Sequence, residues 1–93
     1  MQKLSTENVD TISPGQCRAA RGLLELTQPE LAARAHVGLS TIVDFEKSRR
    51  RVSKEAVRLI ERALEAAGIE FICENGGGPG VRLKKSQKGK RQK

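Results

Sequence analysis

Residues 28–47, with the sequence QPELAARAHVGLSTIVDFEK, decide the fold of this chain. Thr27, directly before them, is a favourable N-cap for a helix, and Glu30 stands where a capping box needs its acidic partner. An apolar stripe at helical spacing follows, made of Leu31, Ala32 and Ala35. These features predict a short helix over Gln28–Ala35.

A second helix, Leu39–Lys47, is predicted after the triplet His36-Val37-Gly38, which interrupts the first pattern. Ile42 and Phe45 lie on its apolar side. The facing residues of the first helix are small alanines, so the two backbones can approach closely at a steep angle. This layout is a helix-turn-helix, which presents its second helix to a DNA major groove.

From roughly Gln16 to Ala67 the chain resembles the lambda repressor/Cro-like family, also called the XRE family. The matching residues are Arg21, Leu26, Thr27, Gln28, Glu30, Leu31, Ala32, Val37, Ser40, Thr41, Ile42, Phe45, Glu46 and the basic loop that ends at Ser53. It is the combination of these residues that is specific. The resemblance implies a five-helix DNA-binding domain, usually found in dimeric transcriptional regulators. We expect a mainly α fold, a four-to-five-helix lambda-repressor-like bundle with a short C-terminal β-hairpin.

Three residues depart from the family pattern. Glu25, His36 and Ser48 stand where the family often has a glycine with positive φ. Each is expected to cost about 1 kcal/mol relative to glycine, because a Cβ atom is strained in the left-handed region.

Composition limits the chain to one domain with a modest core, because it has 93 residues, no Trp or Tyr and two Phe. No apolar run approaches membrane-spanning length, and the N-terminus MQKLSTENVD has no hydrophobic signal region. We therefore expect no membrane partner and a cytoplasmic, nucleoid-associated location of bacterial type.

No catalytic or metal-binding constellation is evident. Cys17 and Cys73 are far apart and lack metal-ligand spacing, and we interpret both as reduced structural thiols. The single histidine, His36, is assigned to a turn. We predict a protein that is not an enzyme and needs no metal or cofactor.

The net charge of +7 is concentrated at two places. Residues 84–93 hold six Lys/Arg and no acid, and the tail is either a disordered solubility element or a phosphate-binding arm. A second cluster follows the helix-turn-helix and consists of Lys47, Arg49, Arg50, Arg51 and Lys54. Its position favours contact with DNA phosphates over a merely solvated loop.

Along the chain, residues 1–12 are predicted to form a flexible arm and residues 13–68 the DNA-binding domain. Ser13, Pro14 and Gln16 predict a capped helix that ends at about Leu24, and Ser53 caps a last helix that runs to about Ala67.

A β-hairpin is predicted over residues 69–83, with a glycine-rich turn that lacks the lysine and helix of a phosphate loop. The last helix has more apolar surface than three short helices can cover, and a hairpin alone is marginal. We therefore predict dimerisation through this part of the chain. The predicted interface residues are Leu59, Ala63, Ile69, Phe71, Val81 and Leu83.

The resemblance places the DNA-contacting residues on the outer face of the second helix of the motif. Base contacts fall on Leu39, Ser40 and Asp44, with Val43 alongside. Leu39 and Val43 could touch a thymine methyl, and Asp44 could accept a hydrogen bond from cytosine.

The resemblance implies supporting roles for four other residues. Gln28 would meet a backbone phosphate and brace a side chain of the second helix, and Thr41 would lie next to a phosphate or base. Arg21 and Glu46 would form a structural ion pair.

Two main functional hypotheses stay open, and a third, general nucleic-acid binding through the basic tail, predicts binding without sequence preference. The first is a sequence-specific transcriptional regulator that binds double-stranded DNA as a homodimer on a palindromic operator. The second is a helix-turn-helix protein that acts through protein–protein contact, as antitoxins and anti-activators do. The sparse polar character of the recognition face keeps the second hypothesis open, and the Arg49–Arg51 cluster favours the first.

Overall fold

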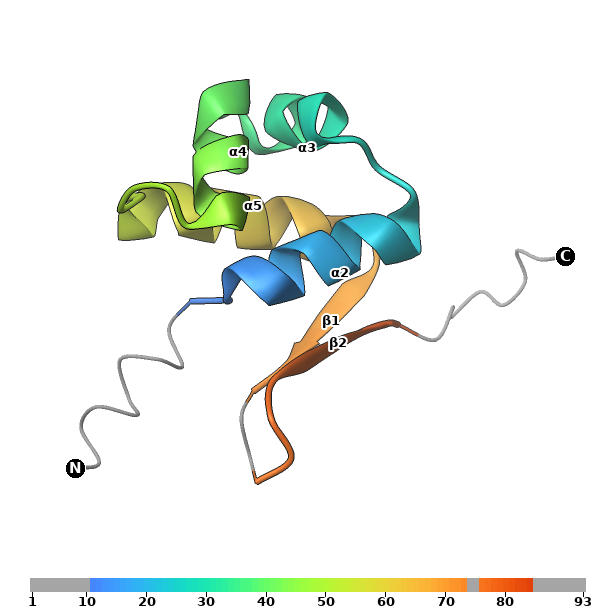
Figure 1. Cartoon of the computed structure of the whole chain (residues 1–93). Helices are drawn as coiled ribbons and strands as arrows, with labels where there is room; N and C mark the ends of the chain where they lie inside the picture. The colour runs from blue at the N-terminus through green and yellow to red at the C-terminus, as the bar shows by residue number, and fades with distance from the viewer. Residues whose placement is uncertain (1–10, 74–75, 85–93) are drawn as a thin grey trace, which may run out of the picture.

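The computed structural model describes residues 11–73 and 76–84. It contains α2 (Pro14–Leu24), α3 (Gln28–Ala35), α4 (Leu39–Lys47), α5 (Lys54–Ala66), β1 (Ile69–Ile72) and β2 (Gly80–Leu83) (Figure 1). The predicted fold class is confirmed: the described part of the chain has four helices followed by a short antiparallel hairpin. The predicted arm and basic tail lie almost wholly outside the described residues.

Local sequence signals define the helix ends. Ser13 and Thr27 each accept a hydrogen bond from the backbone N–H three residues later, and both capping boxes are complete. Glu25, His36 and Ser48 adopt the left-handed conformation at the ends of their helices, with φ of 59°, 60° and 54°. The turns therefore keep the geometry that glycine would favour, with a side chain present.

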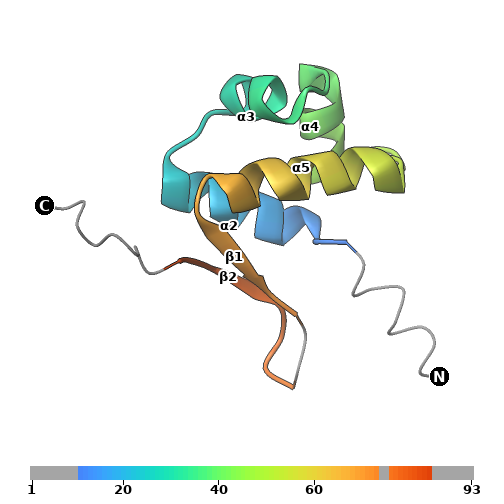
Figure 2. The same ribbon diagram turned by 180° about the vertical axis from the view of Figure 1, so that it is seen from behind.

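The core lies between the helices and continues to the start of the hairpin. α3 and α4 lie on one side of α2 and α5, and the hairpin extends on the other side (Figures 1 and 2). The largest fully buried apolar side chains are Leu31, Ile42, Ile60, Leu64 and Ile69. This core rigidly positions α4, whose outer surface it leaves uncovered.

The hairpin is attached to its own chain. β1 pairs with β2 in the register Ile69–Leu83 to Ile72–Gly80. The side-chain amide of Gln16 in α2 donates to the carbonyl oxygens of Ile72 at 3.2 Å and of Gly80 at 2.9 Å. One side chain therefore connects both strands to α2.

Ile69 differs from the sequence prediction. It was expected to contact a second chain, but its side chain is fully buried in the core of its own chain. The short link from α5 through Gly68, whose φ is 113°, turns the first strand residue inward. Ile69 is therefore not available at a dimer interface.

Candidate nucleic-acid interface

The outer face of α4 carries the residues that the sequence assigned to DNA contact. Leu39 is 45% exposed, and Ser40 and Lys47 are exposed as well. Thr41 and Val43 are half-buried. The inner face is closed, because Ile42 and the Glu46 side chain are buried. α4 is thus fixed along one side and open to solvent along the other.

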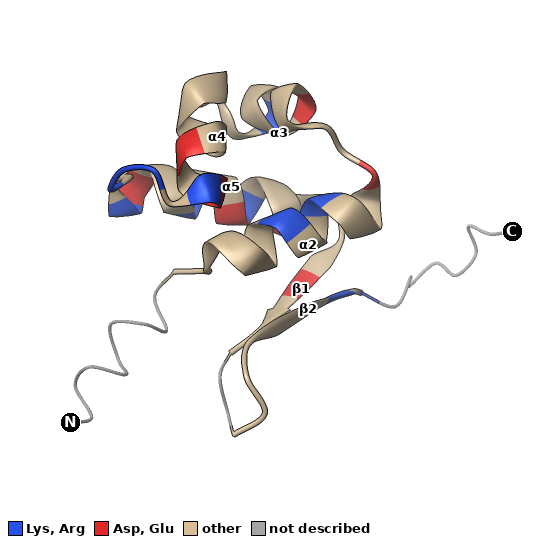
Figure 3. Cartoon of the chain, in the orientation of Figure 1, with Lys and Arg blue, Asp and Glu red and all other residues tan. Residues whose placement is uncertain are grey.

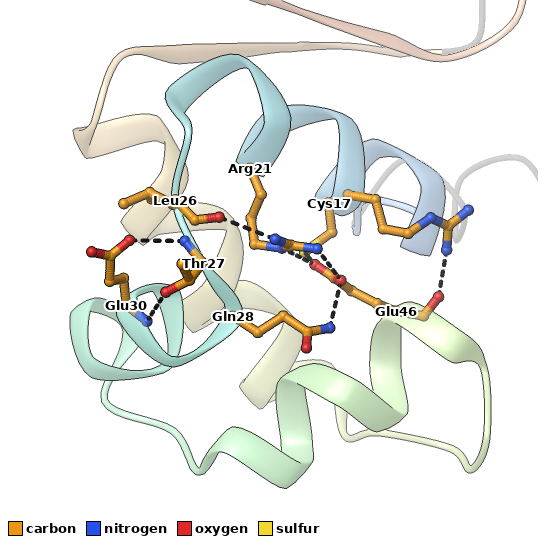
Figure 4. A network of polar contacts seen from close by, with 8 residues as sticks. Cys17, Arg21, Leu26, Thr27, Gln28, Glu30 and Glu46 are labelled. Carbon is orange, nitrogen blue, oxygen red and sulfur yellow. Dashed lines mark hydrogen bonds and ion pairs between the residues drawn. The ribbon is translucent and has the colours of Figure 1, made fainter.

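Glu46 is the centre of a buried hydrogen-bond network, and its side chain is only 1% exposed (Figure 4). Arg21 donates to both of its carboxylate oxygens, from Nε at 2.7 Å and from Nη2 at 2.8 Å. The Gln28 amide adds a bond to Oε1 at 2.9 Å, and the Cys17 thiol one to Oε2 at 3.1 Å. The geometry is that of a fully hydrogen-bonded buried carboxylate.

The same network joins three helices. Arg21 and Cys17 lie on α2, Gln28 opens α3, and Glu46 lies in the last turn of α4. Arg21 also donates to the Leu26 carbonyl at 3.0 Å, and Arg18 donates to the backbone oxygen of Glu46. The end of α4 is therefore held by charge-assisted bonds from both sides.

The network shifts the pKa of two of its groups. Burial alone raises the pKa of Glu46, but the bonds from Arg21, Gln28 and Cys17 outweigh it and leave this pKa below its usual range. Burial is the main reason that the pKa of the Cys17 thiol is raised, and its bond to Glu46 adds to this. Cys17 therefore stays a neutral donor, and Glu46 stays an ionised acceptor.

Asp44 lies two residues before Glu46 and has a separate partner. Its Oδ2 is 2.6 Å from Nε of Arg50, in the loop after α4. The Asp44 side chain is 18% exposed and the Arg50 side chain 53%. This pairing was not predicted, because a separation of six residues matches no helical spacing.

The loop that follows the C-terminal end of α4 is rich in basic residues (Figure 3). Arg49, Arg50 and Arg51 are all exposed. Among the described residues, no carboxylate lies within ion-pair distance of Arg49 or Arg51. Within the part of the chain that the structure describes, the loop therefore presents two arginines without a carboxylate partner and one that is paired with α4.

The structure shows which side chain of α4 Gln28 contacts. Its amide nitrogen is bound to Glu46, so this side chain does brace α4. Contact with a phosphate remains a prediction.

The predicted interface residues in the C-terminal part of the chain differ in their exposure to solvent. Leu59 and Leu83 are 37% and 49% exposed. Ala63, Phe71 and Val81 are partly buried against the chain's own core.

Sequence reasoning missed the contacts that Gln16, Cys17 and Arg18 make across the fold. Gln16 was assigned only to a capping box, which it does form, and the other two carried no functional signal. A polar residue on the inward face of α2 was the one available hint for Gln16, since a buried amide needs partners.

Other kinds of site are not evident in the part of the chain that the structure describes. It contains no group of three or more His, Cys, Asp or Glu residues that could hold a metal ion. None of its helices is long and apolar enough to cross a membrane.

Comparison with known families gives one match. A family model described as helix-turn-helix matches residues 18–70, which is more than half of the chain. No curated protein matches the chain.

Proposed function

Because the chain belongs to the helix-turn-helix family of the lambda repressor/Cro-like, or XRE, type, we propose that it is a sequence-specific transcriptional regulator. Its ligand is double-stranded DNA, and α4 enters the major groove. The observation that carries the proposal is the asymmetry of α4: Glu46 fixes one side of the helix, and the other side is exposed beside three arginines. We place its action at chromosomal DNA in a bacterial cytoplasm.

The residues of α4, of the start of α3 and of the basic loop have two roles in DNA binding. Leu39, Ser40, Val43 and Asp44 read base edges. Gln28, Thr41, Lys47, Arg49, Arg50 and Arg51 contact or attract phosphates, which orient the domain without reading sequence.

Selection of bound duplexes from a random pool tests this proposal. We expect enrichment of one motif, repeated in inverted orientation at a fixed spacing. Arg49→Ala with Arg51→Ala should weaken binding to all duplexes and flatten the salt dependence by roughly one unit per lost phosphate contact. Ser40→Ala should instead change the enriched sequence. A pool that stays random after selection by the wild type would contradict the proposal.

We further propose that the protein binds as a homodimer through its C-terminal part. The described sheet has only two strands, so its outer edges lack a strand partner there. Leu59 and Leu83 add exposed apolar surface. A two-fold arrangement would cover these features and set two copies of α4 about 34 Å apart, one DNA turn.

A pair of matched substitutions tests the dimer. Leu83→Glu places a charge in the proposed interface, and Leu39→Glu places one at a similarly exposed site on the recognition face. Leu83→Glu should sediment as a monomer, whereas Leu39→Glu should stay dimeric and lose DNA binding. A wild type that is monomeric at tens of micromolar, where a weak dimer of roughly micromolar Kd would still form, would contradict the dimer.

The second candidate function is recognition of another regulatory protein by the α4 face. The exposed Leu39 and the paired Asp44 favour it, since both reduce the polar groups available to bases. Random-pool selection decides between the two, because a protein-binding face predicts no enriched duplex.

A further inference from the structure

The Asp44–Arg50 pair joins the recognition helix to the basic loop behind it. Ser48 turns the chain back at the end of α4, and the Arg49 N–H donates to the Asp44 carbonyl at 2.9 Å. Arg50 then reaches the Asp44 carboxylate from outside, at 2.6 Å. The arginine is therefore bound to the helix that would read bases, instead of being free to meet a phosphate.

We propose that the Asp44–Arg50 pair contributes to sequence specificity. Arg50 stays bound to Asp44 on most DNA sequences, and it contacts a phosphate only where a base offers a hydrogen-bond donor to Asp44. The donor would be the exocyclic amino group of a cytosine in the major groove, the hydrogen-bond donor that suits a carboxylate there. The inference rests on the proposed binding of DNA by α4.

In the free protein the Asp44–Arg50 pair has little effect on stability. It is exposed, and exposed ion pairs contribute little to folding. Its effect on DNA binding is larger, because an unpaired carboxylate next to a polyanion is repelled, while an arginine that meets a phosphate releases a counterion. The two partners thus have opposite effects at the same surface.

On an arbitrary sequence these effects oppose each other. If Arg50 moves to a phosphate, Asp44 faces DNA without a partner. If Arg50 stays, one phosphate contact is lost. Only a site with a donor opposite Asp44 allows both groups to be paired at once. Binding to non-matching DNA is therefore reduced, which is how a repulsive element produces specificity.

Arg49 and Arg51 differ from Arg50 in this respect. Neither is paired with a carboxylate among the described residues. They can contact phosphates on any duplex, so general affinity and sequence discrimination are assigned to different arginines of one loop.

The test compares full-length wild type, Asp44→Asn, Arg50→Gln and the double variant by fluorescence anisotropy over a salt series. The probes are the duplex most enriched by the wild type and a shuffled duplex of equal length and composition. Glu70→Gln is the matched control. It removes the same charge from another exposed ion pair, with Arg82 at 3.1 Å, on the hairpin.

Asp44→Asn should bind the shuffled duplex several-fold to about tenfold more tightly, with a salt slope steeper by roughly 0.9, as expected for one added phosphate contact. The gain should disappear when Arg50→Gln is added. Selection by Asp44→Asn should also replace cytosine by adenine at one position per half-site, because asparagine pairs with adenine. Thermal melting of each variant confirms that it is folded.

Two results would overturn the inference while leaving the proposed function intact. One is that Asp44→Asn and Glu70→Gln change shuffled-duplex affinity equally, which would make the effect one of net charge. The other is that the gain persists without Arg50, which would make the pair a loop brace only. If the wild type enriches no duplex, the proposed function and this inference fail together.

Discussion

Two carboxylates of α4, Asp44 and Glu46, are each paired with an arginine at almost the same distance, 2.6 Å and 2.7 Å. The surroundings of the two pairs differ. The Glu46 side chain is 1% exposed and that of its partner Arg21 20%, whereas Asp44 and Arg50 are 18% and 53% exposed. Two residues correspond to about 200° of helical rotation, so the carboxylates point to nearly opposite sides of α4.

The distance between the charged groups therefore does not determine the role of an ion pair, because burial and the number of hydrogen bonds matter more. Glu46 has four side-chain hydrogen bonds from three residues and no access to water that could replace them. Among the described residues, the Asp44 carboxylate has one partner, Arg50, and it keeps partial access to solvent. The first pair is therefore a structural element, and the second is free to exchange partners.

The largest expected effect is the loss of Glu46. Glu46→Ala should lower the free energy of unfolding by about 3–5 kcal/mol, because Arg21 would be left without its charge partner. Asp44→Ala should change it by less than about 1 kcal/mol. Urea denaturation followed by circular dichroism measures both. Equal losses of unfolding free energy in the two variants would show that both pairs contribute equally to stability.

Replacing each arginine by lysine should also affect the two pairs differently, with a smaller difference in stability than the carboxylate substitutions give. Arg21→Lys keeps the charge but loses the two-pronged contact with Glu46 and the bond to the Leu26 carbonyl. We expect a loss of about 1–3 kcal/mol from these buried hydrogen bonds. Arg50→Lys is the control, and its melting temperature should match the wild type. If Arg21→Lys is also unchanged, charge alone holds α4.

Acid should act on the Glu46 network. The folded-state pKa of Glu46 lies below the ordinary value of 4.5, so its contribution is fully present above that value. It is lost as pH falls further through the folded pKa, because the carboxylate then takes up a proton. The melting temperature should therefore fall below about pH 4.5 in the wild type, and less steeply in Glu46→Gln. A slope that is unchanged in Glu46→Gln would contradict the assignment.

The smallest expected effect concerns Ser48, which lies between Glu46 and Arg50 in the sequence and has a φ of 54°. Ser48→Gly removes the left-handed strain but makes the unfolded chain more flexible, so the net gain should be about 0.5 kcal/mol. Calorimetric melting measures it. Arg49→Gly, at a neighbouring position without positive φ, should instead destabilise, and the same sign for both would exclude backbone strain as the cause.

The helices could be predicted closely because their signals are local. Ser13, Thr27 and Ser53 each cap the helix that follows, and the structure keeps the predicted bounds of α3 and α4. The Arg21–Glu46 contact came from the family resemblance, and the structure brings the two groups together. The hairpin followed from its strand-like residues and its glycine turn.

The rest depended on how these elements meet. Gln16 bonds to both hairpin strands from more than fifty residues away, and no sequence spacing indicates such a contact. Ile69 is predicted from the sequence to contact a second chain, but its side chain is buried in the core of its own chain. The partner of Asp44 was also unforeseen, because it depends on the path of an irregular loop.

The helix-turn-helix, its capped ends and the basic loop can be predicted from the order of residues alone, because periodicity, capping and charge are properties of neighbouring residues. How deeply each carboxylate of α4 is buried, which arginine Asp44 holds and how the hairpin is attached follow only from the folded arrangement. These outcomes depend on which side of each helix meets another element. Burial therefore gives two chemically similar ion pairs different roles. The Arg21–Glu46 pair is shielded from water and stabilises the fold, whereas the Asp44–Arg50 pair is in contact with water and can exchange partners.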